Sequence, residues 1–119
     1  MCPIRMSKLE TAIRTVLELN AAFNRRDLPA MLALMSEDCV FESAQSARLA
    51  GRQSIAAFWE DFFARTPSAK IEIEEIFSLG ERCVMRWRFT IGAAEPVRGV
   101  DLFRVPGGLI SEILSYEKR

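Results

Sequence analysis

The sequence contains no histidine, and this absence narrows the chemistry that the protein can use. Histidine is the most common metal ligand in proteins and the only side chain that titrates near neutral pH without help from its surroundings. Acid–base chemistry would therefore have to come from a carboxylate, a thiol or a tyrosine whose pKa is shifted by the fold. We expect no metal and no other cofactor.

A net charge, a membrane segment and a disulfide pattern are missing as well. The 16 basic and 16 acidic side chains cancel, so no overall charge attracts the chain to nucleic acid or anionic lipid. Cys2, Cys39 and Cys83 form no CxxC pair, and an odd number of cysteines cannot all pair within one chain. Met1–Glu10 lacks the apolar run of a signal peptide, and charged residues are spread too evenly for a membrane-spanning helix. We therefore predict a cytoplasmic protein with reduced thiols that binds no nucleic acid and no membrane.

The residues that are present fit one globular domain. Hydrophobic residues make up 50% and charged residues 27% of the 119 residues, which is typical of a soluble folded chain. This length can bury one core but not two. No repeat or linker interrupts the chain, so we predict a single domain over residues 1–119 with a core from about residue 7 to residue 117.

Two helices are predicted near the N-terminus. Ser7 and Glu10 form a capping box, in which each side chain accepts a hydrogen bond from the other's backbone amide, so a helix should begin there. Apolar residues at helical spacing continue this helix to about Asn24. Asp27 then caps a short second helix with Pro29 in its first turn, where an amide hydrogen is not needed.

The middle of the chain predicts a short strand, a loop and a third helix. A polar turn at 36–38 precedes a β-favouring run, Cys39–Ser43, and residues 44–49 are too small and polar for a regular element. Gly51 precedes a helix whose buried face is rich in aromatic residues. Thr66–Pro67 ends this helix, because the residue before a proline avoids helical geometry.

The second half of the chain alternates apolar and polar residues, which is typical of strands with one buried face. A strand that begins at Ala69 changes phase at Glu75–Ile76, and a β-bulge would explain the change. Glycine-containing turns then separate three more predicted strands: Cys83–Ile91, Val97–Val105 and, after the Pro106–Gly108 hairpin signal, Ile110–Glu117. Three helices followed by an antiparallel meander predict an α+β fold in which a curved sheet wraps around the helices.

Asp101 is the candidate site residue that this alternation singles out. It shares one face of its strand with an apolar or side-chain-free row made of Val97, Gly99, Phe103 and Val105. A carboxylate on such a row is unfavourable unless it is paired or protonated. Asp101 is therefore either a functional acid or base, or a structural carboxylate that is hydrogen-bonded to the backbone or to Trp87.

Three segments carry a resemblance to a known superfamily. They are Ala21–Leu28 (AAFNRRDL), Asp38–Glu42 (DCVFE) and Arg98–Arg104 (RGVDLFR), and the last, followed by a Gly-Gly hairpin, is the most specific. With the order of elements from Ser7 to Glu117, they resemble the nuclear transport factor 2-like superfamily, in particular its SnoaL-like polyketide cyclases and ketosteroid isomerases. The resemblance implies a cone-shaped, cystatin-like fold with a curved antiparallel sheet around three N-terminal helices. It also implies an apolar pocket and a homodimer formed through the sheet.

The resemblance implies roles for individual residues. In the isomerases, an aspartate at the position that matches Asp101 is protonated and donates a hydrogen bond to the oxygen on which negative charge develops. Their general base matches Ser43 and their pocket tyrosine matches Leu19, so this part of their mechanism is missing here. The second carboxylate of related epoxide hydrolases matches Ser115. An aspartate on the same strand performs acid–base work in SnoaL-like cyclases, which leaves Asp101 as the candidate catalytic residue.

Aromatic side chains are candidates for the walls of the pocket, because they suit apolar rings. The alternative is that they fill the core. The residues that we expect to contact a small apolar ligand are Trp59, Phe62, Trp87, Phe103, Phe41, Ser43 and Ser115. Cys39 and Cys83 are expected to be small buried hydrophobes, since no histidine is present to lower the pKa of a thiol. Glu42 is one residue from the position that matches the isomerases' base and would reach the pocket if the strand register were shifted, but alternation points it to the opposite face of its strand. Glu117 shares the inward phase of Ser115 at the end of its strand and is interpreted as solvated.

The outer face of the predicted sheet combines arginines with apolar residues. It would carry Arg86, Arg88, Arg98, Val100, Leu102, Arg104, Leu114 and Tyr116. A homodimer through this face would cover the apolar residues, with the arginines paired to Glu72, to Glu74 or to the other subunit. A basic patch for RNA or lipid is the alternative.

Two kinds of function fit these features. The first is a cofactor-independent enzyme that moves a proton next to the carbonyl group of an apolar substrate, as in isomerisation, cyclisation or dehydration, with Asp101 as acid or base. The second is a non-catalytic protein of the same fold, either a binding module for an apolar ligand or a dimeric scaffold. An open cavity around Asp101 favours the first, and a cone filled by aromatic side chains favours the scaffold.

Overall fold

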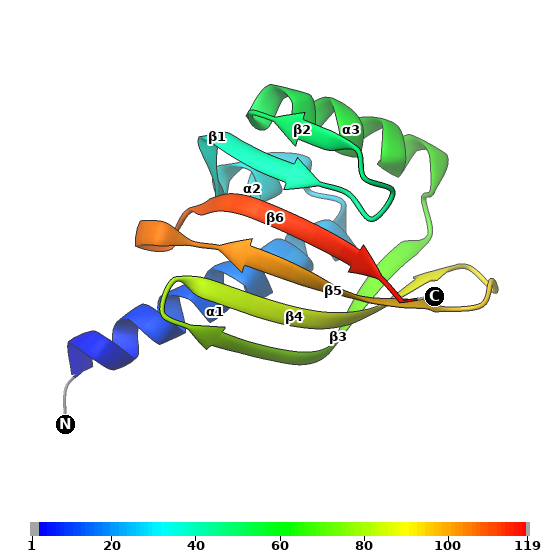
Figure 1. Ribbon diagram of the computed structural model, residues 1–119. Coiled ribbons are helices and arrows are strands. Elements are labelled where there is room, and N and C mark those ends of the chain that lie inside the picture. Colours follow the sequence, from blue (N-terminus) through cyan, green and yellow to red (C-terminus); the bar gives the residue numbers. More distant parts are fainter. Residues whose placement is uncertain (1–2, 119) are drawn as a thin grey trace.

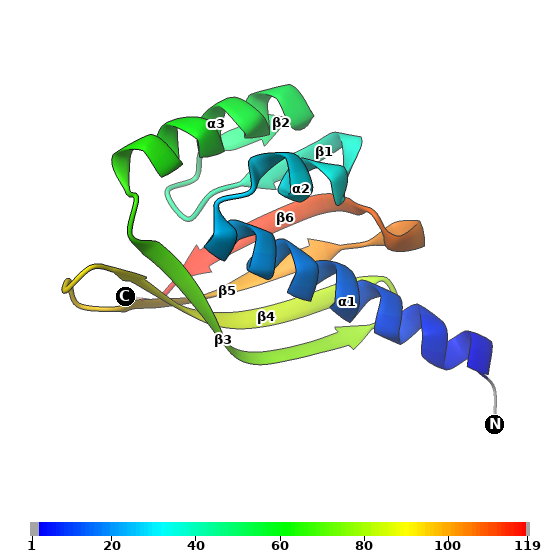
Figure 2. The same ribbon diagram turned by 180° about the vertical axis from the view of Figure 1, so that it is seen from behind.

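Three helices pack against a six-stranded sheet (Figure 1). The computed structural model describes residues 3–118. Its helices are α1 (Pro3–Arg25), α2 (Leu28–Ala33) and α3 (Arg52–Arg65). Its strands are β1 (Met35–Glu42), β2 (Arg48–Ala50), β3 (Ala69–Leu79), β4 (Arg82–Ile91), β5 (Val97–Arg104) and β6 (Ile110–Glu117). The strands lie in the sheet in the order β2-β1-β6-β5-β4-β3. Seen from behind, α1 and α2 lie over one face of the curved sheet and α3 crosses its β2 end (Figure 2). The predicted α+β fold is confirmed.

The two N-terminal helices follow the prediction except at the start of α1. This helix begins at Pro3, so Ser7 lies inside it and does not cap it. Proline suits a first helical position because its φ is already helical and no amide hydrogen is needed there. Asp27 caps α2 as predicted, and its Oδ1 accepts a hydrogen bond of 3.1 Å from the amide of Ala30. Within residues 3–118, none of the helices has the length and apolar character needed to cross a membrane.

β1 differs most from its prediction. It begins at Met35, so the turn expected at 36–38 is part of the strand, and it pairs in parallel with β6. The register between these two strands shifts between Met35 and Val40, which accommodates the polar residues as an irregularity. Arg48 and Leu49, expected in a loop, belong to β2, which pairs with β1. The sheet is therefore mixed and not antiparallel throughout. The sequence did not predict this pairing, because strands that are far apart in sequence pair without a local signal.

The later strands form the predicted antiparallel meander. The phase change in β3 is a bulge, since the register between β3 and β4 shifts between Ile73 and Glu75. β5 and β6 are joined by Pro106–Gly108, which forms a short 3₁₀ helix. In the middle of β4 and β5 the inner face buries residues that alternation assigned to it, among them Met85 and Phe103, each 3% exposed. At the strand ends, Ile91 and Val97 were assigned to the same face but are 39% and 36% exposed.

Polar side chains at the end of α1 attach the helix to β3. Asn24 donates from Nδ2 to the carbonyl oxygen of Ile71 and accepts at Oδ1 from the amide of the same residue, both at 2.9 Å. Arg26 donates to the carbonyl oxygen of Ala69 at 2.8 Å, and its guanidinium lies over the ring of Phe63 in α3. These contacts hold α1 along the helix-covered face of the sheet, where it forms one wall of a cavity.

The outer face of the sheet combines ion pairs with an apolar row. Glu74 contacts both Arg86 (3.4 Å) and Arg98 (3.1 Å), and Glu72 contacts Arg88 (3.3 Å). Three of the arginines predicted for this face therefore have carboxylate partners within the chain. Beside them, the strand registers align an apolar row across four strands, made of Phe77, Val84, Leu102 and Leu114.

Candidate functional site

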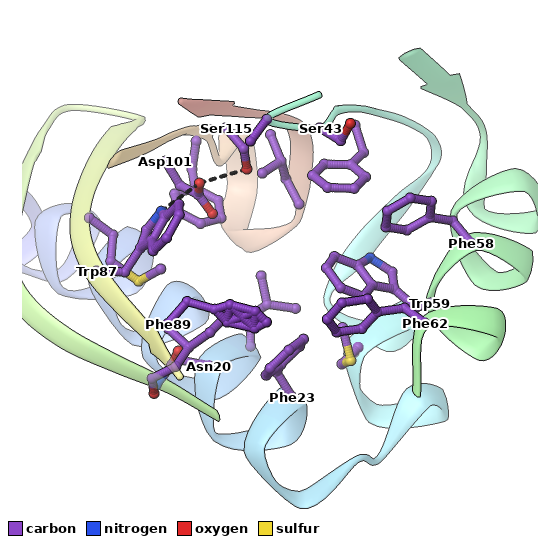
Figure 3. A pocket seen from close by; sticks show the side chains of 18 of the residues that line it. Asn20, Phe23, Ser43, Phe58, Trp59, Phe62, Trp87, Phe89, Asp101 and Ser115 are labelled. Atoms are coloured by element: carbon purple, nitrogen blue, oxygen red, sulfur yellow. Dashed lines mark hydrogen bonds between the residues drawn. The ribbon is translucent and has the colours of Figure 1, made fainter. Parts of the chain in front are cut away.

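A cavity of about 510 Å³ lies between α1, α3 and the inner face of the sheet (Figure 3). This volume is within the range of pockets that hold small molecules. Aromatic side chains form much of its wall: Phe23, Phe41, Phe58, Trp59, Phe62, Trp87, Phe89 and Phe103. The polar residues on the wall are Asn20, Ser43, Gln45, Arg65, Asp101, Ser115 and Glu117. The cone is therefore open, and its interior is mostly apolar.

The structure brings every residue that was predicted for the site to this one cavity. These residues are Asp101, Trp59, Phe62, Trp87, Phe103, Phe41, Ser43 and Ser115. They come from α3, from strands β1, β4, β5 and β6 and, for Ser43, from the turn after β1.

The aromatic wall on α3 both packs the core and lines the cavity. The centroid of Trp59 lies 5.4 Å from that of Phe23 on α1, 5.4 Å from that of Phe41 on β1 and 5.2 Å from that of Phe62. Helical spacing places Phe58, Trp59 and Phe62 on the same face of α3. Such edge and stacked contacts hold the rings in fixed orientations. The wall that a ligand would meet is therefore preformed.

Asp101 presents one oxygen to protein donors and the other to the cavity. Its Oδ1 accepts a hydrogen bond of 2.8 Å from the Trp87 indole Nε1–H and one of 2.6 Å from the Ser115 hydroxyl. No hydrogen bond from residues 11–118, whose side chains the structure describes, reaches Oδ2, which points away from both donors (Figure 3). Burial raises the pKa of Asp101 to about 6, against the opposing effect of the bonds from Ser115 and Trp87, which favour the ionised form.

The position of Trp87 depends on Gly99. Trp87 pairs with Gly99 across β4 and β5, and atoms of the indole ring occupy the space that a Cβ on Gly99 would need. The carbonyl oxygen of Tyr116 closes the same space from β6. A glycine is therefore required here for steric reasons, and it lets the indole lie against the sheet with its N–H directed to Asp101.

Ser43 and Leu19 line the cavity but supply no base. The Ser43 Oγ accepts from the amide of Ala47 at 3.1 Å, and the two residues also share a backbone hydrogen bond of 2.8 Å. Ser43 thus closes the turn between β1 and β2. The side chain of Leu19 on α1 has no polar atom. The structure places both residues at the cavity.

Sequence reasoning did not assign Asn20, Glu117 or Arg65 to the site. Asn20 donates weakly to the carbonyl oxygen of Ile71 (3.4 Å), and its buried Oδ1 has no hydrogen-bond partner among the described residues. Glu117 accepts from Gln45 at 3.2 Å, which links β6 to the turn after β1. A signal did exist for two of them. Asn20 stands one helical turn from the inward-facing Phe23, and Glu117 shares the inward phase of Ser115.

The other titratable candidates lie away from the cavity. Cys39 and Cys83 are free, almost fully buried thiols, and burial raises the pKa of each to about 11. Negative charge on nearby Asp38 contributes to the shift at Cys39. Glu42 pairs with Arg48 at 3.5 Å. Among the side chains of residues 11–118, no group of three or more cysteines, aspartates or glutamates is arranged to hold a metal ion.

The sequence matches the family model of the SnoaL-like domain over residues 16–113. Because this match covers most of the chain, the protein belongs to the SnoaL-like domain family, within the nuclear transport factor 2-like superfamily. No curated protein is significantly similar in sequence.

Solved structures agree with this assignment. A nuclear transport factor 2-like protein of unknown function from Mesorhizobium loti is 34% identical, with 94% of each chain covered and a TM-score of 0.83. A candidate SnoaL-like polyketide cyclase from Jannaschia sp. CCS1 is 18% identical over 93% of this chain and 88% of that one, with a TM-score of 0.84. A candidate ketosteroid isomerase from Kribbella flavida is 22% identical over 94% of this chain and 81% of that one, with a TM-score of 0.83. The last two similarities show a shared fold.

Proposed function

We propose that this protein is a cofactor-independent enzyme that moves a proton next to the carbonyl group of a small apolar molecule. The observation that supports this proposal is the free oxygen of a buried carboxyl group. Asp101 directs Oδ2 towards an aromatic cavity of about 510 Å³, while Trp87 and Ser115 hold Oδ1. The folds of the isomerase-like and cyclase-like neighbours are consistent with such chemistry.

Both protonation states of Asp101 are useful in this site, because burial brings its pKa to about 6. The ionised group takes the α-proton at Oδ2 as the enolate forms and returns it to a carbon atom of the product, so that the proton is conserved. The neutral group donates from Oδ2 to a carbonyl oxygen, which acidifies the neighbouring C–H bond towards a base supplied by the solvent and stabilises the enolate oxygen. Isomerisation, cyclisation and dehydration next to a carbonyl all require such steps. The apolar wall strengthens these interactions because it excludes water.

Exchange of α-protons for deuterium tests this proposal without knowledge of the natural substrate. The protein is incubated in D₂O near neutral pH with a panel of apolar cyclic ketones and 1,3-diketones, and loss of the α-proton signal is followed by NMR. We expect acceleration over buffer on the order of 100-fold for at least one compound. Asp101→Asn should abolish it. Glu42→Gln, which removes a carboxylate outside the cavity, should not. Equal rates for Asp101→Asn and the wild type would contradict the proposal.

A non-catalytic binding module is the second candidate, and the hydrogen bonds of the two cavity serines favour it. Ser115 donates to Asp101 and Ser43 closes a turn, so neither position offers a second acid–base group. If this candidate is correct, compounds from the same panel will raise the melting temperature of the wild type and of Asp101→Asn alike, with exchange at the rate of buffer. A scaffold without a ligand is disfavoured, because the cone is open.

We also propose that the protein forms a homodimer through the outer face of the sheet. Phe77 is 52% exposed and Leu102 is 38% exposed in the apolar row on that face. Because Arg86 and Arg98 are paired with Glu74 within the chain, a second copy meets an apolar row that is bordered on that side by neutralised charges. Leu102→Glu should convert the dimer to a monomer in analytical ultracentrifugation. Leu109→Glu, at an exposed leucine in the β5–β6 connection, should not, and a monomeric wild type would contradict the proposal.

The proposed site of action is the cytoplasm. Cys39 and Cys83 are free thiols that are buried in the core. Reduced cysteines in a folded core are typical of a reducing compartment.

A further inference from the structure

We propose that Trp87 and Ser115 are positioning residues that give the two oxygens of Asp101 different tasks: Oδ1 is held as an acceptor, and Oδ2 carries the proton that meets the ligand. The catalytic consequence rests on the proposed function above. The location of the proton, however, can be measured in the protein without any substrate.

The two donors meet on the same oxygen. The indole N–H of Trp87 and the hydroxyl of Ser115 both donate to Oδ1, at 2.8 and 2.6 Å. An indole N–H can only donate. A proton on Oδ1 would turn that atom into a hydroxyl oxygen, which is a weaker acceptor, and would force Ser115 to turn its own hydrogen away. A proton on Oδ2 leaves both bonds intact, so the neutral acid is protonated on the side of the cavity.

Neither Trp87 nor Ser115 can easily move from Oδ1 to the other oxygen of the Asp101 carboxyl group. Trp87 is only 8% exposed, and its ring lies against Gly99, where no side chain would fit. Ser115 is the direct partner of Asp101 in the pairing of β5 with β6. Both donors are therefore fixed by the sheet itself. They are in place without a ligand, which is what pre-organisation of a site requires.

Few other charges face Asp101. On β4 its direct partner is Met85, and α1 presents to the cavity only apolar residues and the uncharged Asn20. The remaining charged groups on the cavity wall are Glu117 on β6 and Arg65 on α3. Glu117 is hydrogen-bonded to Gln45 and Arg65 to Asp61, and neither has a hydrogen bond to Asp101. Trp87 and Ser115 are thus the groups that distinguish its two oxygens.

The indole N–H of Trp87 is a direct probe of this arrangement. Trp59 is the other tryptophan of the chain, so Trp59→Phe leaves a single indole signal in the ¹⁵N-labelled protein. We expect this signal to titrate with a midpoint near the pKa of Asp101, about 6. It should nevertheless remain downfield and protected from exchange with solvent at both ends of the titration, because Oδ1 accepts in both states. In the same background, Asp101→Asn should remove the titration.

Variants of Ser115 test the second donor. Ser115→Ala should shift the midpoint upward, since the bond from this hydroxyl lowers the pKa of Asp101. Ser115→Thr, which keeps a hydroxyl, should restore it. Ser111→Ala is the matched control, because Ser111 lies on the same strand but donates to the carbonyl oxygen of Arg104 at 3.4 Å. If the midpoint shifts in Ser115→Ala but not in Ser115→Thr or Ser111→Ala, the cause is the missing hydroxyl and not a general destabilisation of β6.

Two results would overturn the inference. The first is an indole signal that moves upfield and exchanges rapidly at low pH, since this would place the proton on Oδ1. The second is an indole signal that does not respond to pH across the range from about 4.5 to 8. A titration as expected in a protein that exchanges no α-protons would leave the inference standing and remove the proposed enzymatic function instead.

Discussion

Asp101→Asn is expected to make the folded protein more stable at pH 8 while it removes the acid–base activity. The asparagine oxygen can accept the same bonds from Trp87 and Ser115, so the packing is retained. The wild type, in contrast, must hold an ionised carboxyl group where burial disfavours it. The rise of the Asp101 pKa from 3.8 to about 6 corresponds to at most about 3 kcal/mol at roughly 1.4 kcal/mol per unit.

The pH dependence of this effect follows from the direction of the shift. The pKa of Asp101 in the folded protein lies above its value of 3.8 in the unfolded chain, so the folded state binds the proton more tightly. This contribution to stability is complete below pH 3.8 and is lost as the pH rises through about 6. The gain in free energy of unfolding from Asp101→Asn should therefore grow between about pH 4 and pH 7 and then stay constant.

Urea unfolding followed by circular dichroism at a series of pH values checks this prediction. Asp61→Asn is the control, because Asp61 is exposed and its ion pair with Arg65 on α3 lies at the surface. Exposed ion pairs contribute about 0–1 kcal/mol, so the control should change stability little. If the difference in free energy of unfolding between Asp101→Asn and the wild type did not depend on pH, burial would not disfavour the ionised form of Asp101. A more stable but inactive variant is typical of residues that serve function at the expense of stability.

Gly99→Ala is expected to be among the most damaging single changes in the chain. The added Cβ would overlap the Trp87 ring and the carbonyl oxygen of Tyr116, and the latter belongs to the backbone of β6. A side chain can rotate, but a carbonyl group in a strand pairing cannot move without shifting the strand. We expect a loss of about 2–3 kcal/mol in the free energy of unfolding, as for an overpacked core.

Gly99→Ala should also disturb the site in those molecules that remain folded. Displacement of Trp87 would break its bond to Asp101, so the indole N–H should lose its protection from solvent exchange. Gly80→Ala is the matched control. Gly80 has a φ of +62° but no atom within 4 Å of the added Cβ, so its cost is the backbone strain alone, about 1 kcal/mol. If Gly99→Ala were no more destabilising than Gly80→Ala, the steric argument would be wrong.

Patterns in the sequence correctly predicted those structural features that depend on residues close together in the chain. The cap at Asp27 and the bulge predicted at Glu75–Ile76 both depend on neighbouring residues. The cap is confirmed, and the bulge is found close to its predicted place, between Ile73 and Glu75. Alternation along Val97–Val105 likewise placed Asp101 on the inner face of its strand. The start of α1 was missed because the capping box at Ser7 and Glu10 is also compatible with the interior of a helix.

The features that sequence reasoning missed depend on strand pairing. The parallel contact of β1 with β6 joins distant parts of the chain and leaves no periodic signal. For the same reason, the bond from Ser115 to Asp101 could not be predicted, because it follows from the register of β5 with β6. The role of Gly99 depends on that register and on the orientation of the Trp87 ring. The sequence had offered the hydrogen bond between Trp87 and Asp101 as one alternative, and the structure shows it. The bond from Ser115 to the same oxygen required the three-dimensional structure.

The contacts of α1 with β3 also bear on how the protein avoids aggregation. β3 is the last strand on its side of the sheet, and such a strand offers unpaired backbone groups to any other extended chain. Asn24 occupies both the amide and the carbonyl oxygen of Ile71, and Arg26 occupies the carbonyl oxygen of Ala69. A foreign strand therefore cannot add to the first part of β3 without displacing α1, which protects the sheet from edge-to-edge growth at the end where its cavity lies.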